Sequence, residues 1–192
     1  MSCDPKLGGD ITFDCTDKPI QGLERKSLLI NRSSIDWAAI TKDPTGTIIT
    51  SLPLLAGETA YVVDNIKNLN NATSTFVVGD ADNGHKHAFT GRFYNVDAAA
   101  LANINSFQDE GEFVLITETK YKGSDMQSAF KIFGLDVGMK MSEGVYDANA
   151  NKGAYTFTLS NEDGMEEPTA FYIWLETDYA TTKPRFDAKL AA

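Results

Sequence analysis

Short runs of β-branched and aromatic residues recur along the chain from Gly22 onward, and clusters of Gly, Asn and Asp separate them. This alternation is typical of antiparallel strands joined by turns. The pattern predicts ten strands, at Glu24–Asn31, Thr47–Ser51, Ala60–Ile66, Ser74–Gly79, Lys86–Tyr94, Glu112–Thr119, Ala129–Leu135, Val137–Ser142, Ala154–Ser160 and Ala170–Thr177.

Two of these segments differ in how they use their faces. In Ala154–Ser160, apolar residues alternate with hydroxyl residues, so one face is expected to be buried and the other wet. In Ala170–Thr177, Tyr172 and Trp174 make the second face apolar as well. Such a strand either crosses the core or turns one face toward a partner subunit. We expect this face to support self-association, so that Trp174→Glu impairs assembly and leaves the fold largely intact.

One segment follows a helical period instead. Leu101, Ile104 and Phe107 recur at helical spacing, and Asp97 is placed to cap the first turn. The sequence therefore predicts a β-rich α+β fold. Two antiparallel sheets pack as a sandwich or barrel in this fold, and one helix near residues 97–107 flanks them.

The chain divides into an arm and one domain. Residues 1–20 lack either hydrophobic period, which predicts an N-terminal arm, and residues 21–192 then form a single β-rich domain. Cys3 and Cys15 both lie in the arm, so a disulfide between them would staple the arm alone. A reduced, intracellular state is the default expectation for so few cysteines, and whether the two pair stays open.

The arm shares one property with the segment Thr41–Glu58, because both offer few residues for local packing. This long segment is punctuated by proline and glycine, yet it is too apolar for a free loop. Either the arm and this segment carry contacts between neighbouring subunits, or the segment folds back on its own core. The sequence leaves both alternatives open.

The net charge of the chain and its short apolar runs argue against some classes of function. The chain has 17 Lys and Arg against 27 Asp and Glu, a formal net charge of −10. This excess argues against a nucleic-acid-binding groove, where cations must offset phosphates. The longest early apolar run, Leu28–Ile30, is too short for a signal-peptide core or a membrane span. A soluble chain with no membrane partner is expected.

His85 and His87 are the two histidines of the chain, and with Gly79 upstream they resemble the first half of the cupin metal motif. The second half is missing, because the expected glutamate and third histidine are absent from the sequence. On a strand both rings point to one side, so a metal site completed by Asp80 or Asp82 stays open geometrically. The alternative is a pair of exposed hairpin histidines.

Asp147, Asn149 and Asn151 match the first ligand positions of a calcium loop. Lys152 then stands where that loop needs glycine, and Thr158 where it needs a bidentate glutamate. A turn between two strands is the simpler interpretation.

Glu162, Asp163, Glu166 and Glu167 surround Gly164 in an acidic cluster that we expect to be solvated surface. No nucleophile elbow, phosphate loop or dinucleotide fingerprint is present in the sequence. We therefore assign no catalytic, cofactor-binding or metal-binding residues and no cofactor, and we expect the protein not to be an enzyme.

Four features together resemble the major tail tube proteins of tailed bacteriophages. They are the opening Met1–Asp4, the Gly22-Leu23 pair before the first strand, the helix 97–107 between strands and the late strand Gly153–Phe157. The resemblance implies a two-sheet fold with a flanking helix and a subunit that forms hexameric rings through a shared inner barrel.

The same resemblance implies that the rings stack into a tube, contact other phage tail proteins and let DNA pass without specific binding. The protein would then be made in the bacterial host cytoplasm and end in the virion. No long glycine-rich stacking hairpin is evident in this chain, which is where it departs from the family.

Other classes fit the same pattern. A head decoration, head fibre or tail terminator protein would also be acidic, β-rich and free of catalysis. A ligand-binding β domain would use exposed aromatic residues such as Trp37, Trp174 or tyrosines, and a cupin-like metal protein would use the two histidines.

Overall fold

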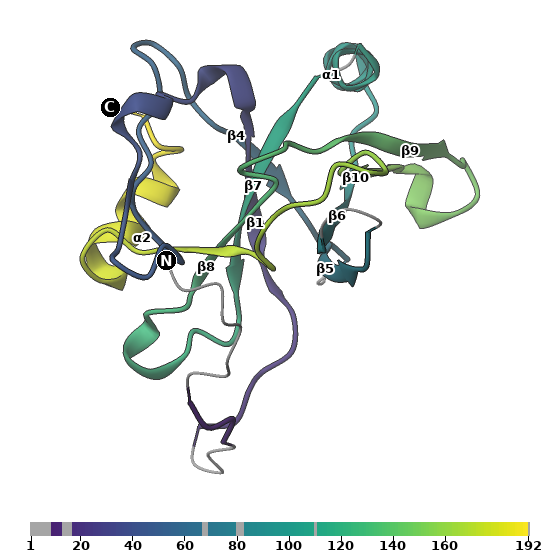
Figure 1. Ribbon diagram of the computed structural model, residues 1–192. Coiled ribbons are helices and arrows are strands. Elements are labelled where there is room, and N and C mark those ends of the chain that lie inside the picture. Colours follow the sequence, from purple (N-terminus) through teal and green to yellow (C-terminus); the bar gives the residue numbers. More distant parts are fainter. Residues whose placement is uncertain (1–8, 13–16, 67–68, 80–82, 110, 192) are drawn as a thin grey trace.

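The computed structural model describes residues 9–12, 17–66, 69–79, 83–109 and 111–191, in which two β-sheets pack against each other (Figure 1). The strands are β1 (Leu23–Asn31), β2 (Thr41–Lys42), β3 (Ile48–Ser51), β4 (Tyr61–Asp64), β5 (Asn71–Val77), β6 (Gly84–Phe93), β7 (Phe113–Thr119), β8 (Phe130–Phe133), β9 (Lys140–Tyr146), β10 (Tyr155–Ser160) and β11 (Tyr172–Trp174). The helices are α1 (Ala98–Gln108) and α2 (Tyr179–Asp187). The β-rich α+β class predicted from the sequence is confirmed.

Each of the ten predicted strand segments overlaps one of these strands, whereas β2 and α2 were not predicted. The sequence pattern did not predict helix α2, because Pro184 lies inside it and threonines, which are weak helix formers, precede that proline. Its start is nevertheless built in an ordinary way. Asp178 is the N-cap, and its Oδ1 accepts a hydrogen bond from the Thr181 amide at 2.7 Å.

The larger sheet has the strand order β2-β3-β11-β8-β7-β1-β4, and the smaller has the order β5-β6-β10-β9. The smaller sheet is antiparallel throughout. In the larger sheet β11 runs parallel to β3, so the expectation of two purely antiparallel sheets was wrong at this pair. A parallel pair needs a long crossover connection, and here the whole segment from β4 to β10 is that connection.

The larger sheet is covered on both faces. Its interior strand β7 is buried along its whole length. Val114 and Ile116 point into a cluster that includes Phe186 of α2, whereas Leu115 points into the cluster between the two sheets. Figure 1 shows α2 and the smaller sheet on opposite sides of the larger sheet. Two apolar layers therefore stabilise the fold, one on each side of β7.

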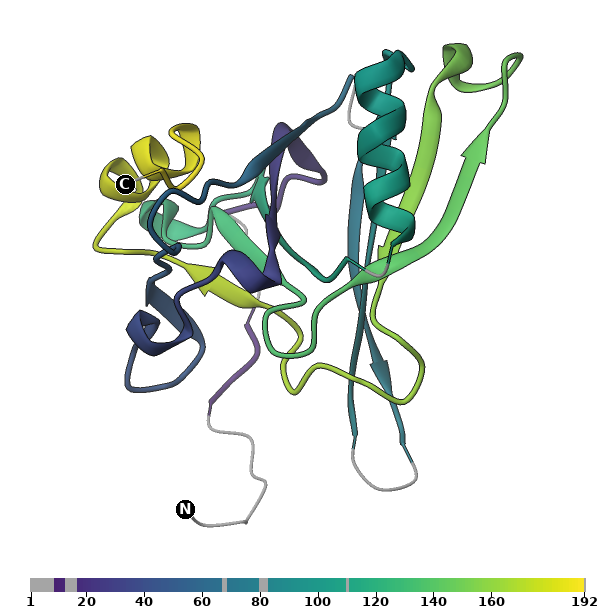
Figure 2. The ribbon, with the colours of Figure 1, turned by 90° about the horizontal axis from the view of Figure 1, so that it is seen from above.

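Helix α1 lies at one end of the sandwich (Figure 2). The predicted cap is confirmed, because Asp97 Oδ1 accepts a hydrogen bond from the Ala100 amide at 2.8 Å. The ring of Phe107 lies 4.8 Å from that of Phe113 on the larger sheet and 5.2 Å from that of Phe157 on the smaller one. The helix thus ties both sheets together, while Leu101, predicted on its apolar face, is half exposed.

The two-sided apolar strand is a core strand. Trp174 is completely buried, and its ring lies 5.7 Å from that of Phe130. Phe130 in turn contacts Phe186 of α2, with ring centroids 5.0 Å apart. The prediction that Trp174 faces a partner subunit was therefore wrong, because a helix that the sequence pattern did not reveal covers this face. Trp174→Glu would place a charge in the core instead.

The segment Thr41–Glu58 folds back on the domain, which was one of its two predicted alternatives. Ile49 and Leu52 are completely buried, and Leu54 packs against the same cluster as Trp174. Leu55 is half exposed. The apolar residues of this segment thus mainly serve the core of their own chain.

The arm is described in part, at residues 9–12 and 17–20. Asp17 Oδ2 accepts hydrogen bonds from the Tyr121 hydroxyl at 2.8 Å and from Ser124 Oγ at 3.3 Å. The end of the arm is therefore attached to the domain. Cys3 and Cys15 lie outside the described residues.

Candidate functional site

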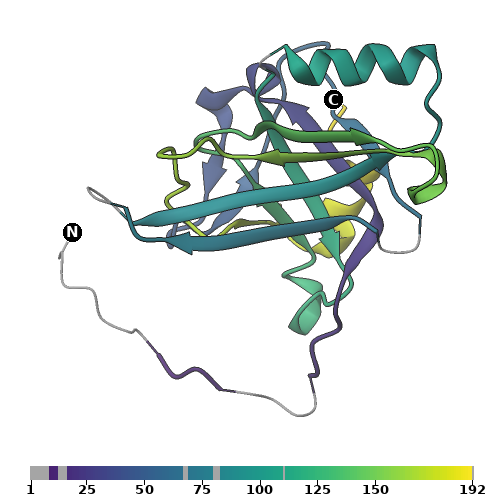
Figure 3. The same ribbon diagram turned by 90° about the vertical axis from the view of Figure 1, so that its right-hand side faces the viewer.

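The smaller sheet, β5-β6-β10-β9, has one covered face and one open face. Its inner face contributes Phe89, Phe157 and Leu159 to the cluster between the sheets. Figure 3 shows this sheet from the front, with no described element lying over its outer face. The sheet also has two edges, because β5 pairs with β6 alone and β9 with β10 alone among the described strands. These two edges and the open face form the candidate site.

The outer face is rich in hydroxyl side chains. Thr156, Thr158 and Ser160 alternate with the buried residues of β10, as the sequence predicts. The register places Thr90 opposite Thr158, and their hydroxyls lie 3.3 Å apart. Arg92 Nε donates a hydrogen bond to Thr156 Oγ1 at 3.4 Å. Cross-strand contacts of this kind stabilise a wet sheet face without requiring a covering layer.

The edges of this sheet carry exposed apolar side chains. Val145 and Tyr146, on β9, are 50% and 58% exposed. Near the opposite edge, Phe76 on β5 is 58% exposed. An unpaired strand edge with apolar side chains is a template for pairing with another chain.

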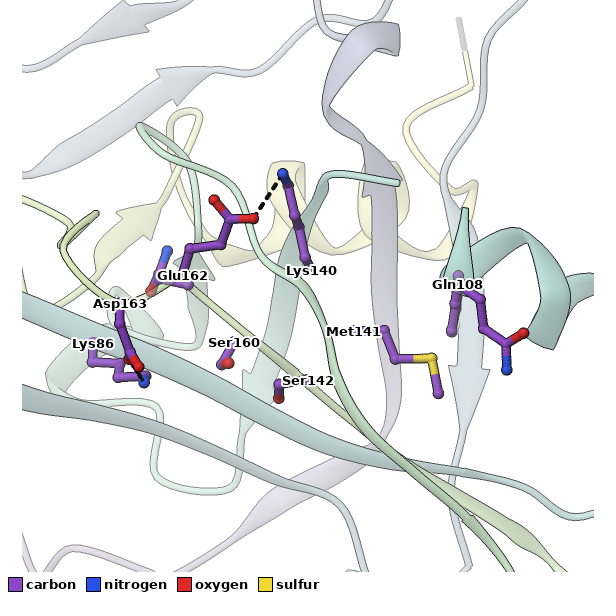
Figure 4. Close-up of a pocket in the computed structure, with 10 residues that line it drawn as sticks. Lys86, Gln108, Lys140, Met141, Ser142, Ser160, Glu162 and Asp163 are labelled. Atoms are coloured by element: carbon purple, nitrogen blue, oxygen red, sulfur yellow. Dashed lines mark hydrogen bonds and ion pairs between the residues drawn. The ribbon is translucent and has the colours of Figure 1, made fainter. Parts of the chain in front are cut away.

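A pocket of about 380 Å³ opens beside the outer face (Figure 4). Two ion pairs lie at it. Lys86 pairs with Asp163, and Lys140 Nζ donates to Glu162 Oε1 at 3.0 Å. The hydrogen bond from Lys86 holds the pKa of Asp163 below its usual range. The acidic segment after β10 thereby neutralises two cations at this face.

The lining residues of this pocket, all in the described part of the chain, include neither histidine nor cysteine. Ser142 Oγ donates to the carbonyl of Thr158 at 3.3 Å, so its proton is directed at the backbone and not at a base. Asn161 is buried and joins two elements, accepting from the His87 amide and donating to the Gly138 carbonyl, both at 2.7 Å. The arrangement serves structure and charge balance.

His87 is a buried structural residue. Its Nδ1 accepts a hydrogen bond from the Gly134 amide at 3.0 Å, and its Nε2 lies 3.1 Å from the carbonyl of Thr169. An amide donor and a carbonyl acceptor together fix the neutral tautomer with the proton on Nε2. Burial lowers the pKa of His87 despite the raising effect of the Thr169 contact. Both ring nitrogens are therefore already used within the fold.

His85 does not complete a metal site with His87 among the described residues. Its Nδ1 lies 3.3 Å from Ser74 Oγ, and its ring packs edge-on against Phe76. The hypothetical further ligands Asp80 and Asp82 lie outside the described residues. Within the described ranges, no group of three or more histidine, cysteine, aspartate or glutamate side chains is arranged to hold a metal ion.

The calcium-like segment is a turn. Asp147 Oδ1 accepts hydrogen bonds from the amides of Asn149 at 2.8 Å and Ala150 at 3.2 Å, which is an Asx turn. Asn151 Nδ2 donates to Thr156 Oγ1 at 3.5 Å. The side chains that would bind calcium thus stabilise the connection between β9 and β10.

The acidic cluster is divided between surface and core. Glu162 and Asp163 are exposed, as expected, but Glu167 is completely buried, so its prediction as solvated surface was wrong. Its carboxylate accepts hydrogen bonds from the amides of Val137 at 2.9 Å and Asp136 at 3.1 Å. Burial raises the pKa of Glu167, and these amide bonds oppose that effect. Glu167 anchors the turn between β8 and β9.

The two tryptophans considered above for a ligand-binding domain are differently placed. Trp174 is buried and cannot contact a ligand. Trp37 is 42% exposed, and the Arg32 guanidinium lies 4.7 Å from its ring centroid. A cation already covers this ring.

In the described part of the chain, neither helix is long and apolar enough to span a membrane. Comparisons of the chain with protein-family models, with curated proteins and with solved structures find no match in any of the three.

Proposed function

We propose that this protein is a structural subunit that assembles with copies of itself through the two edges of the smaller sheet, as the major tail tube subunit of a tailed bacteriophage. The observation that carries the proposal is the combination of an uncovered polar face with two unpaired edges on a sheet whose inner face is sealed. Such a sheet needs no further covering layer in order to fold. The backbone groups of its two edges remain to be paired with another chain.

The strand directions support closure into a ring. Each neighbouring pair in the order β5-β6-β10-β9 is antiparallel, so β5 and β9 run in opposite directions. A copy related by rotation about a central axis would therefore bring its β5 antiparallel to β9 of the first copy. Repeating this head-to-tail contact generates a continuous antiparallel barrel, which removes every edge.

The charges on the outer face support the idea that such a barrel serves as a conduit. The outer face would become the lumen, lined by hydroxyl groups, by Lys86 and Lys140 with their carboxylate partners, and by Arg92, which donates to Thr156 and to the Leu69 carbonyl. A polyanion slides past such a lining because few ionic contacts have to break as it moves. In this proposal DNA passes through stacked rings within the virion.

Lysine substitutions at the two edges test the assembly. Thr73→Lys on β5 and Val145→Lys on β9 change exposed edge positions, and lysine is a residue that blocks edge pairing. We expect negative-stain microscopy to show rings or tubes for the unmodified protein and dispersed subunits for either variant. Ala188→Lys, at the exposed end of α2, is the matched control and should assemble normally.

Mixing the two edge variants tests the head-to-tail geometry. One variant keeps an intact β9 edge and the other an intact β5 edge, so a mixture should form dimers that cannot grow further. Light scattering and sedimentation would detect them. A monomeric unmodified protein at high concentration, or normal rings from either edge variant, would contradict the proposal. Closed rings that never stack would favour a terminator role over a tube.

A further inference from the structure

Lys131 occupies an unusual position between the two sheets. It lies on β8, opposite Thr117 of β7 and Ile173 of β11. Alternation along β8 puts it on the same face as Phe133, which belongs to the cluster between the sheets. Its Nζ lies 4.6 Å from the ring centroid of Phe171. A lysine is thus placed where the surrounding layer is apolar.

The ammonium group of Lys131 differs from those of other lysines in its surroundings. Within the described residues, no carboxylate oxygen lies within 4.0 Å of its Nζ, whereas Lys122 and Lys183 both pair with Glu118. Burial lowers the pKa of Lys131, and nothing opposes that effect. A half-buried charge without a counter-charge is costly, and an incoming anion would compensate it.

Asn70 is a second residue in the wall of the same pocket. Its side chain is almost fully buried, and Nδ2 donates to the Glu24 carbonyl at 3.3 Å. That carbonyl fixes the orientation of the amide, because only the nitrogen can donate to it. Asn70 Oδ1 is buried and accepts no hydrogen bond from the described residues. Because this oxygen is also shielded from solvent, the Lys131 ammonium is the group that a ligand in the pocket would contact.

The pocket is large enough for a ligand. Its volume is about 880 Å³, and its walls come from the end of the arm, the start of β5 and the end of β7. The lining residues in those walls are Pro19, Ile20, Asn71, Ala72, Thr119 and Tyr121. Volumes of several hundred cubic ångströms are typical of small-molecule and peptide side-chain sites.

We propose that this pocket binds a carboxylate, such as that of an aspartate side chain, through the Lys131 ammonium. Among the described residues that line the pocket, Lys131 is the one with a cationic side chain, so its charge matches a monoanion. The net charge of −10 disfavours a polyanion such as a phosphate ester. This site does not depend on the proposed self-assembly.

Calorimetric titration of the full chain tests the site with two matched probes. N-acetyl-aspartate N-methylamide should bind saturably, and the asparagine analogue, which lacks the charge, should bind about tenfold more weakly. Lys131→Met keeps the apolar stem and removes the charge, so we expect this variant to bind the aspartate probe about tenfold more weakly than the unmodified protein does. Lys152→Met, in the exposed β9–β10 turn, removes the same charge elsewhere and should bind like the unmodified protein.

A spectroscopic measurement keeps the proposal testable if affinity is low. The NMR signal of the Lys131 side chain should titrate at lower pH than an ordinary lysine in the free protein, and its pKa should rise when the aspartate probe is added. Lys131→Met should unfold at the same temperature as the unmodified protein or higher, because it removes an uncompensated charge. Equal binding by Lys131→Met, or a Lys131 titration that the probe leaves unchanged, would overturn the proposal.

Discussion

Individual carboxylates in this protein differ by their partners more than by their burial. Glu118 and Glu167 are both buried, but Glu118 accepts hydrogen bonds from two lysines and a tyrosine, whereas Glu167 accepts them from backbone amides. Burial alone would raise the pKa of Glu118, but the bonds from Lys122, Tyr179 and Lys183 outweigh it and the pKa falls. The two residues therefore respond to acid in opposite directions.

Replacing Glu118 should weaken the attachment of α2. Lys122 Nζ and the Tyr179 hydroxyl both donate to Glu118 Oε1 at 2.8 Å, and Lys183 Nζ donates to Oε2 at 3.0 Å. We expect Glu118→Gln to lower the free energy of unfolding by about 1–3 kcal/mol, since it removes the charge that two partly exposed lysines share. Urea denaturation would measure the loss.

The control for that experiment is Glu162→Gln. Glu162 also pairs with a lysine, but its side chain is half exposed, so the expected loss is about 0–1 kcal/mol. The contribution of Glu118 should be complete above the ordinary pKa of 4.5 and disappear as the pH falls through the lower pKa of the folded state. A Glu118 variant as stable as the Glu162 variant would show that the lysines find other partners.

His87 should make the fold sensitive to mild acid. Because burial lowers its pKa in the folded state, the unfolded chain binds the proton more readily below its ordinary value of 6.5. The stability contributed by neutral His87 is present above pH 6.5 and is lost as the pH falls toward the lower pKa. We expect the stability advantage of the unmodified protein over His87→Gln to shrink between pH 7.5 and pH 5 in thermal unfolding.

His85→Gln is the matched control, because it removes a histidine whose ring contacts Ser74 Oγ and Phe76. Glu167 acts with the opposite sign, since its raised pKa favours the folded state at lower pH. Only the difference between the two histidine variants therefore isolates His87. An advantage that is independent of pH would contradict a lowered pKa of His87 in the folded state.

Secondary-structure elements were predictable where a segment's own pattern decides its structure. The alternating β10 and the capped α1 follow directly from the sequence. The pattern of a segment does not reveal which distant segment covers each of its faces. Nothing within β11 tells that α2 lies over Trp174, and nothing near Glu167 tells that the turn after β8 supplies its amides. The outer hydroxyl face was predictable from alternation, whereas the burial of Lys131 depends on distant segments.

The position of β11 gives a sharp prediction for Trp174→Glu. The variant buries an unpaired carboxylate and leaves a cavity beside Phe130, so we expect it to cost about 4 kcal/mol or more and to leave much of the chain unfolded. Near-ultraviolet circular dichroism would detect the loss of packing. Thr177→Glu, exposed a few residues later, should stay within about 0.5 kcal/mol of the unmodified protein.

At the scale of the whole molecule, the excess of acid and the neutralised outer face should prevent tight binding of DNA. We expect a gel-shift assay at low salt to show no retention of duplex DNA at micromolar protein, because Lys86 and Lys140 are already paired. Replacing their partners with Glu162→Gln and Asp163→Asn together should remove the carboxylate at Lys86 and weaken the pairing of Lys140, which keeps Glu112 at 3.9 Å. We expect this double variant to retain DNA in a manner that salt abolishes.

The matched control changes the same number of charges at exposed sites off the smaller sheet, with Asp109→Asn and Asp125→Asn. It should leave the mobility of the DNA unchanged. Salt-sensitive retention by the unmodified protein would contradict a conduit and indicate a DNA-binding role.

The complete burial of β7 also sets the order in which the molecule opens. A strand with core on both faces and a partner on both edges exchanges its amide hydrogens only when the whole domain unfolds. The edge strands β5 and β9 have solvent on one face and on one side, so their outward amides should exchange many times faster. Local stability in the native state is therefore uneven. It is lowest along β5 and β9, the two edges that pairing with other copies would protect, and highest at β7.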